Sequence, residues 1–271
     1  MLHIICLTKS YRLDDFECWV KFHVGPNTKI HIIDNDSSVN IEPICQKYGL
    51  ERIPLVGFAD QWGLFGNILN GKTEIKFEED DIVMFLDDDE FLWYDGNKYS
   101  SLECALKASF KQTGCLLLPE ILMSTHHLTV GRSAVCPEAC YYRRGDLSSQ
   151  GKAAVLWASW LKYSFNHGDT EIGHVPWINK HRYSDVLGSD VSKTTYGLCD
   201  YDAPLRLYHY HIKSETDWDI KIQRGSAAVF VNEPGKNGSY DPDITKDKKF
   251  GGYDIPDFTM KQAWERIKGN S

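Results

Sequence analysis

Short apolar runs alternate with segments of helical periodicity over the first 90 residues. The first run covers residues 2–8, and Phe16 and Trp19 then recur at helical spacing. A second run follows at residues 29–34, and residues 81–87 (DIVMFLD) form a continuous apolar run bounded by acidic residues. Such a run predicts a strand buried on both faces, as in a parallel sheet covered by helices. The pattern therefore predicts an α/β fold with a mixed, mostly parallel sheet flanked by helices.

The rest of the chain continues this alternation. Further strands are expected near residues 52–58, 115–122, 153–160 and 203–212. Helices are expected over residues 9–23, 38–49, 62–70 and 100–112, after Ser214, and over 259–267. Ser100 and Glu103 have the spacing of a capping box, which predicts where the fourth helix begins.

A chain of 271 residues is long enough for one large domain with its own core. We expect residues 1–225 to form this domain. Residues 232–257 are rich in turn-forming residues. We therefore expect residues 226–271 to be a loop-rich C-terminal extension that ends in a short helix.

Charge and hydropathy exclude several classes of protein. The formal net charge is −8, from 38 acidic and 30 basic side chains, and no basic stripe could neutralise a run of phosphates. A nucleic-acid binder is therefore disfavoured. The longest apolar stretches are far shorter than the roughly 20 residues of a membrane helix, and we expect neither a membrane span nor a signal peptide. The eight cysteines show no C-x-x-C pair, which indicates reduced thiols and a cytoplasmic location.

An acidic cluster, Asp87 to Glu90, directly follows the most apolar strand. Ligands of open parallel sheets bind outside the carboxyl ends of the strands, so the cluster lies where a site is expected. In an extended chain Asp87 and Asp89 would point the same way, about 6.5 to 7 Å apart. Adjacent carboxylates repel each other unless a cation or hydrogen-bond donors compensate. We therefore expect a hard divalent cation with oxygen ligands here.

A second polar group lies at residues 209–214 (HYHIKS), at the end of the strand predicted over 203–212. The imidazole of His209 can complete a metal shell that carboxylates begin. Lys213 can pair with a phosphate, and a helix that begins at Ser214 favours anions at its N-terminus. The segment predicts a site for a metal ion together with a phosphate.

A third polar group, IIDNDSS, ends the second strand with Asp34. Thr8, Asp34 and Asp87 each lie at the carboxyl end of a predicted parallel strand, so we expect them to face one crevice. An aspartate in such a crevice can accept hydrogen bonds from a nucleobase or a ribose.

Taken together, these segments resemble glycosyltransferases of the GT-A fold, in the family-2-like and family-92-like group. The matching elements are IIDNDSS (residues 32–38), FLDDDEFLW (85–93) with its D-x-D motif, and HYHIKSETDWDIKIQRG (209–225). ECWVKFHVG (17–25) and KAAVLWASWLKYSFNHG (152–168) are similar to two further segments of the group.

The resemblance implies a single-domain enzyme that moves a sugar from a nucleoside-diphosphate donor, UDP- or GDP-linked, to a hydroxyl of a glycan or other acceptor. It implies Mn²⁺ or Mg²⁺ as cofactor, with Asp87, Asp89 and His209 as candidate ligands. Such a cation would neutralise the departing diphosphate, which a chain of net charge −8 would otherwise repel. The residues expected to bind the donor are Thr8, Asp34, Asp87, Asp88 and Lys213.

The catalytic base is less constrained by the sequence. An inverting transferase needs a carboxylate that removes the proton of the acceptor hydroxyl. Asp169, in the Gly-flanked turn NHGDTEIGH, and Glu120, at the end of a predicted strand, are the main candidates, beside Asp146 and Glu171. A retaining reaction would need none of them as a base.

Two other functions stay open. A sugar nucleotidyltransferase also needs a D-x-D metal site, but no Gly-rich phosphate loop follows the first strand. A non-catalytic carbohydrate-binding or scaffold protein derived from a transferase would suit the aromatic content of 13%. Such a protein tends to lose its acidic motif, whereas this chain keeps all four carboxylates.

Overall fold

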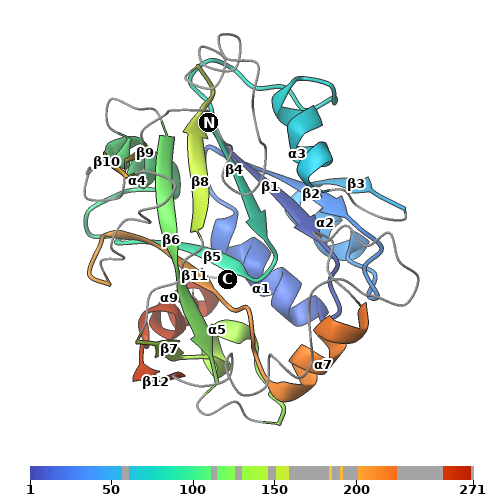
Figure 1. The fold of residues 1–271 in the computed structure, drawn as a ribbon, viewed down its shortest axis with the longest axis vertical. Helices are drawn as coiled ribbons and strands as arrows, with labels where there is room; N and C mark the ends of the chain where they lie inside the picture. The colour runs from blue at the N-terminus through green and yellow to red at the C-terminus, as the bar shows by residue number, and fades with distance from the viewer. Residues whose placement is uncertain are drawn as a thin grey trace.

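The computed structural model describes residues 1–56, 61–110, 115–125, 130–145, 151–158, 183–184, 190–191, 201–224 and 253–269. These residues form an α/β structure with mixed sheets (Figure 1). The predicted α/β class is confirmed.

Four parallel strands form one half of the main sheet, in the order β3-β2-β1-β4. They are β1 (Leu2–Thr8), β2 (Thr28–Asp34), β3 (Glu51–Pro54) and β4 (Ile82–Asp87). The first, second and fourth lie where the apolar runs predict them, and β1 is buried along its whole length. This half of the sheet agrees with the expectation of parallel strands.

The other half of the main sheet is mixed. β8 (Gly151–Leu156) is antiparallel to both β4 and β6 (Cys115–Ser124), while β9 (Tyr183–Ser184) is parallel to β6 and antiparallel to β10 (Asp190–Val191). The antiparallel direction of β8 makes the sheet less parallel than the sequence predicts.

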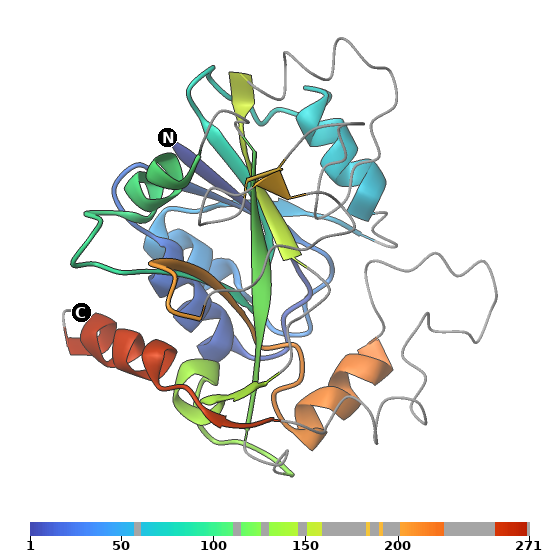
Figure 2. The same cartoon turned by 60° about the vertical axis from the view of Figure 1, so that its left-hand side comes forward.

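Helices cover both faces of the parallel strands (Figure 2). One face packs on α1 (Leu13–His23), α2 (Glu42–Tyr48) and α4 (Leu102–Ser109), and the other face packs on α3 (Gln61–Leu69). Side chains alternate between these two cores along β1, as the pleat of a strand requires. α2 ends at Gly49, as predicted, in the left-handed conformation that glycine adopts readily.

The start of α4 differs from the prediction by one residue. Ser101, rather than Ser100, is the N-cap, and its hydroxyl accepts a hydrogen bond from the backbone N–H of Cys104 at 3.1 Å. Glu103 does not complete a capping box. Its carboxylate lies 2.8 Å from Lys107 instead, an ion pair one turn along the helix.

A smaller sheet lies next to the main one and shares β6 with it. β11 (Leu205–His209) is parallel to β6 and antiparallel to β5 (Glu90–Tyr94). β6 pairs with β8 through residues 115–119 and with β11 through residues 120–122. Glu120 therefore lies where the long strand passes from one sheet to the other.

The C-terminal elements pack against the body of the protein. β12 (Tyr253–Pro256) pairs with β7 (Tyr142–Arg144), and α9 (Thr259–Gly269) contacts α1 and the short helix α5 (Cys136–Ala139). The predicted final helix is confirmed. Its Trp264 stacks on Phe22 of α1 with 5.8 Å between ring centroids. The described part of residues 226–271 thus contributes to the same core, and the domain boundary at 225 stays a prediction.

Candidate metal and anion site

The carboxyl ends of the parallel strands bring together the residues that the sequence selects. Thr8 is the register partner of Asp34, and Leu7 is the register partner of Asp87. The hydroxyl of Thr8 donates a hydrogen bond to Asp88 Oδ2 at 2.6 Å. These strands therefore end at one edge of the sheet, and the expectation that the three residues face one crevice stays a prediction.

The acidic cluster is bent. Residues 88–89 form a turn between β4 and β5, which belong to different sheets. The expectation of an extended chain with Asp87 and Asp89 pointing the same way is therefore wrong. The strand that follows must leave the main sheet to pair with β11, and this change of direction separates the environments of the two carboxylates.

Helix α1 fixes the position of β5 through two buried hydrogen bonds. Trp19 Nε1 donates to the carbonyl oxygen of Glu90 at 2.8 Å, and the backbone N–H of Leu92 donates to His23 Nε2 at 3.1 Å. His23 Nδ1 in turn lies 2.9 Å from the carbonyl oxygen of Trp19, so this nitrogen carries the proton. The Trp and His of the segment ECWVKFH thus support the strand that carries Glu90.

His209 reaches the acidic turn from the end of β11. Its Nε2 lies 3.4 Å from Asp89 Oδ1, and its Nδ1 lies 2.7 Å from Glu120 Oε2. Burial alone would lower the pKa of His209, but the carboxylates of Glu120 and Asp89 outweigh it and raise the pKa well above the usual range. Without a bound cation, a charged imidazole between two carboxylates stabilises this arrangement.

The atoms of Asp89, Glu90 and His209 can converge on one cation. Each residue offers one ligand atom, and these atoms lie within 4.8 Å of one another. Two carboxylate oxygens and an imidazole nitrogen are a donor set that suits Mn²⁺ or a similar divalent ion. Glu120 adds a second argument, because a metal-binding histidine commonly gives its other N–H to a carboxylate that fixes its orientation. The residues present therefore fit a divalent cation.

Asp87, the third predicted ligand, has a different contact. Its Oδ2 lies 3.1 Å from Lys152 Nζ, and the same ammonium lies 2.9 Å from Glu90 Oε1. Among the described residues, Glu90 stands beside Asp89 and His209 in the position that the sequence assigns to Asp87. Burial raises the pKa of Glu90 to about 8, although Lys152 acts in the opposite direction.

Lys152 and Lys221 add positive charge that sequence reasoning misses. Lys152 projects from β8 and is buried, and Lys221 Nζ, from α7 (Glu215–Arg224), lies 3.0 Å from Asp89 Oδ2. Only the resemblance of residues 152–168 to a segment that begins with lysine pointed toward Lys152. The lysines and the imidazole partly compensate the carboxylates of the acidic turn.

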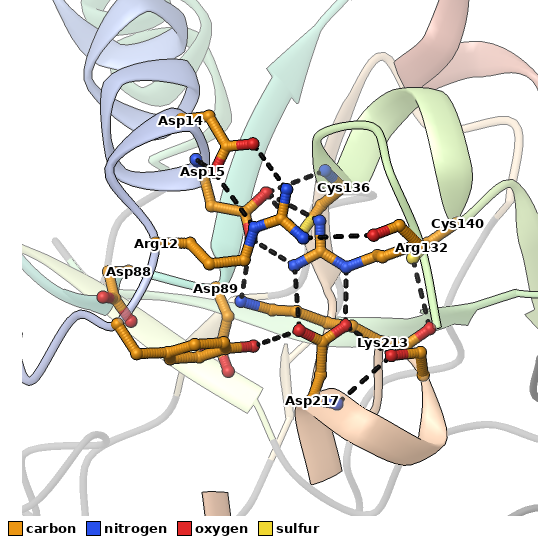
Figure 3. A network of polar contacts seen from close by, with 12 residues as sticks. Arg12, Asp14, Asp15, Asp88, Asp89, Arg132, Cys136, Cys140, Lys213 and Asp217 are labelled. Carbon is orange, nitrogen blue, oxygen red and sulfur yellow. Dashed lines mark hydrogen bonds and ion pairs between the residues drawn. The ribbon is translucent and has the colours of Figure 1, made fainter. Parts of the chain in front are cut away.

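Lys213 lies at the edge of a buried network of charged side chains (Figure 3). At the centre of this network Arg132 bridges Asp15 of α1 and Asp217 of α7. Ser214 caps α7, as predicted, and accepts from the backbone N–H of Asp217 at 3.2 Å. Burial would lower the pKa of Lys213, but its neighbours, among them Asp15 and Asp89, raise it, so Lys213 is an ammonium. Nothing in the sequence pattern around Arg132 indicated this role.

Asp34, a predicted nucleoside contact, already has hydrogen-bond partners within the protein. Asp34 accepts two hydrogen bonds from Arg52, at 2.7 and 3.0 Å, and one from the backbone N–H of Ser37 at 3.0 Å. Its carboxylate thus ties β2 to β3 and to the following turn. Asp169, the first candidate for the base, lies outside the described residues, as do Asp146 and Glu171.

No protein-family model and no curated protein sequence matches this chain. Within the described ranges, no helix is both long and apolar enough to cross a membrane.

Proposed function

We propose that this protein is a metal-dependent glycosyltransferase of the GT-A type. It would move a sugar from a nucleoside-diphosphate donor to a hydroxyl of a glycan or another acceptor. The observation that carries the proposal is the contact of Asp89 with His209, whose other ring nitrogen is bound by Glu120, at the carboxyl edge of a sheet that also presents Thr8. The family resemblance in the sequence supports the same conclusion.

The charges around the site suit a diphosphate leaving group. Asp89, Glu90 and His209 would hold the cation, which when bound would supply positive charge to the phosphate oxygens. Lys213, which precedes the N-cap of α7, would add a second positive charge. The donor's nucleoside would lie near Thr8, Asp34 and Asp88, as the resemblance implies. UDP- and GDP-linked sugars are both compatible with these groups.

The surroundings of Glu120 bear on which carboxylate acts as the base. Glu120 is buried and lies 2.7 Å from His209 Nδ1, which suits a residue that orients the imidazole. We therefore propose Asp169 as the base of an inverting reaction. Asp169→Asn should abolish transfer while donor binding survives.

A thermal-shift screen of nucleoside diphosphates and nucleotide sugars with Mn²⁺ tests the proposal. We expect stabilisation by one nucleoside diphosphate that disappears with EDTA and in Asp89→Ala, together with slow release of nucleotide from the matching donor. Stabilisation by free oligosaccharide that is indifferent to metal would instead support a binding protein. Release of pyrophosphate from a nucleoside triphosphate would support a nucleotidyltransferase.

A further inference from the structure

Lys213 is a buried ammonium whose Nζ makes no hydrogen bond to a carboxylate among the described residues. Its side chain is only 9% exposed. Among the described residues, Asp15 Oδ2 is the carboxylate oxygen within ion-pair distance of Nζ. The distance between these two atoms is 3.9 Å, which is too long for a hydrogen bond. The ring of Tyr11 lies beneath it, with 5.6 Å from Nζ to the centroid. An ammonium has three N–H donors, so an anion that approached Nζ could accept hydrogen bonds that Asp15 is too far away to accept.

Asp15, the neighbour that could neutralise Lys213, is already occupied. Arg132 donates to Oδ1 at 2.9 Å and also to Oδ2, and the backbone N–H of Cys136 donates to Oδ1 at 3.0 Å. The thiol of Cys136 lies 3.3 Å from the same oxygen. Both oxygens of Asp15 therefore accept hydrogen bonds from Arg132, whereas Lys213 has only the longer ion-pair contact with Oδ2.

Arg132 itself has no capacity left for a ligand. Nε donates to Asp217 Oδ2 at 2.6 Å, and the remaining N–H groups are directed at Asp15, at Asp217 Oδ1 (3.4 Å) and at the carbonyl oxygen of Ala134 (2.8 Å). All five donors of the guanidinium are thus used. At 2% exposure the side chain cannot contact a substrate directly.

We propose that Arg132 is a positioning residue for Lys213: by binding both oxygens of Asp15, it prevents that carboxylate from approaching to hydrogen-bond distance of the Lys213 ammonium, whose N–H donors remain available for a diphosphate. Figure 3 shows the ammonium end of Lys213 on the side of the network where Asp88 and Asp89 are drawn. This inference rests on the proposed function only in assigning the diphosphate to a nucleotide donor. The anion site itself follows from the contacts of Asp15, Arg132 and Lys213.

The competition between Arg132 and Lys213 for Asp15 can be measured with inorganic pyrophosphate and Mn²⁺, by calorimetry on the full chain. Lys213→Met should abolish binding. Asp15→Asn removes the competing carboxylate, so we expect pyrophosphate to bind about 3- to 10-fold more tightly while the melting temperature falls. The neighbouring exposed carboxylate supplies a matched control, because Asp14→Asn should leave the affinity unchanged.

Arg132→Lys keeps the charge but loses the planar fork that binds two carboxylates. Asp15 can then turn toward Lys213, and we expect pyrophosphate affinity to fall about tenfold. Adding Asp15→Asn to this variant should restore an affinity within about twofold of Asp15→Asn alone. This rescue keeps the proposal testable if Arg132→Lys by itself folds poorly.

A merely structural network predicts a different pattern, in which Asp15→Asn and Arg132→Lys both weaken binding in step with their loss of stability. That result would overturn the proposal, and so would the absence of any Lys213-dependent pyrophosphate binding in the unaltered protein. If pyrophosphate binds as expected but no nucleotide sugar is ever turned over, the proposed function fails and this inference stands. If sugar transfer occurs while Asp15→Asn weakens pyrophosphate binding, the proposed function stands and this inference fails.

Discussion

His209 and Glu120 lie on neighbouring parallel strands, and the imidazole Nδ1 is 2.7 Å from the carboxylate Oε2. An ionised carboxylate can only accept a hydrogen bond, so this contact places a proton on Nδ1. The other ring nitrogen, Nε2, then faces Asp89 Oδ1 at 3.4 Å. The pair therefore directs one specific nitrogen of His209 at the acidic turn.

Replacing Glu120 should weaken metal binding without removing a ligand atom. In Glu120→Gln the amide can donate to Nδ1 and favour the wrong tautomer, so we expect Mn²⁺ affinity to fall about 10- to 100-fold. Titration followed by electron paramagnetic resonance measures this directly. Glu103→Gln, which alters an ion pair with Lys107 on α4, is the control and should leave the affinity unchanged. An unchanged affinity in Glu120→Gln would contradict the orienting role of Glu120.

The structure also distinguishes between two sets of ligands. Asp89→Asn should reduce Mn²⁺ affinity by more than tenfold, because Asp89 shares the group with Glu90 and His209. Asp87→Asn should reduce it only a few-fold, since the carboxylate of Asp87 lies 3.1 Å from Lys152 instead. The same titration on the two isosteric variants makes the comparison. A larger loss in Asp87→Asn would favour the set predicted from the sequence.

The parallel half of the fold could be predicted from sequence because its signals are local. The run at residues 82–87 is apolar at nearly every position, and Gly49 marks a helix end by its own conformational preference. Ser100 and Ser101 carry the same side chain, so the choice of cap depended on backbone geometry that no local pattern fixes. The direction of β8 was likewise not encoded in its own residues.

The sequence predicted only some of the residues that lie together at the candidate site. Asp89 and His209 were selected by motif, and they meet. The placement of Glu90, rather than Asp87, beside Asp89 and His209 depends on the turn at residues 88–89 and on Lys152, which is far along the chain. Arg132 could not be predicted, because a single arginine outside any periodic segment gives no indication of two distant aspartates.

Lys152 should contribute strongly to stability, since it is the ammonium that compensates two carboxylates in a buried position. Lys152→Met removes this ammonium from Asp87 and Glu90, and we expect the free energy of unfolding to fall by about 3 to 5 kcal/mol in urea titrations at a pH above the Glu90 pKa of about 8, where Glu90 is ionised. Adding Glu90→Gln removes one of those carboxylates and should recover part of the loss. A change below about 1 kcal/mol in the single variant, typical of exposed ion pairs, would contradict this role.

His23 should make the stability of the protein depend on pH. Burial lowers its pKa to about 4, against 6.5 for an exposed histidine, even though the hydrogen bond to Trp19 acts in the opposite direction. Between these values the unfolded chain binds a proton that the folded protein does not, so stability falls as pH is lowered from about 6.5 to about 4. Protonation would also place a hydrogen on Nε2. This nitrogen could then no longer accept the hydrogen bond from the backbone N–H of Leu92.

The contribution of His23 to the pH dependence of the free energy of unfolding is at most about 1.4 kcal/mol per pH unit. His3 has a similarly lowered pKa of about 4, so the unaltered protein should show both contributions. His23→Gln keeps one donor and one acceptor but does not titrate. Urea unfolding at several pH values should therefore give a flatter curve for His23→Gln between pH 6.5 and 4, even if that variant is less stable at pH 7.5. Parallel curves for the two proteins would mean that His23 binds a proton over the same pH range in the folded protein as in the unfolded chain. Its Nε2 would then not accept the hydrogen bond from β5 in the protonated state.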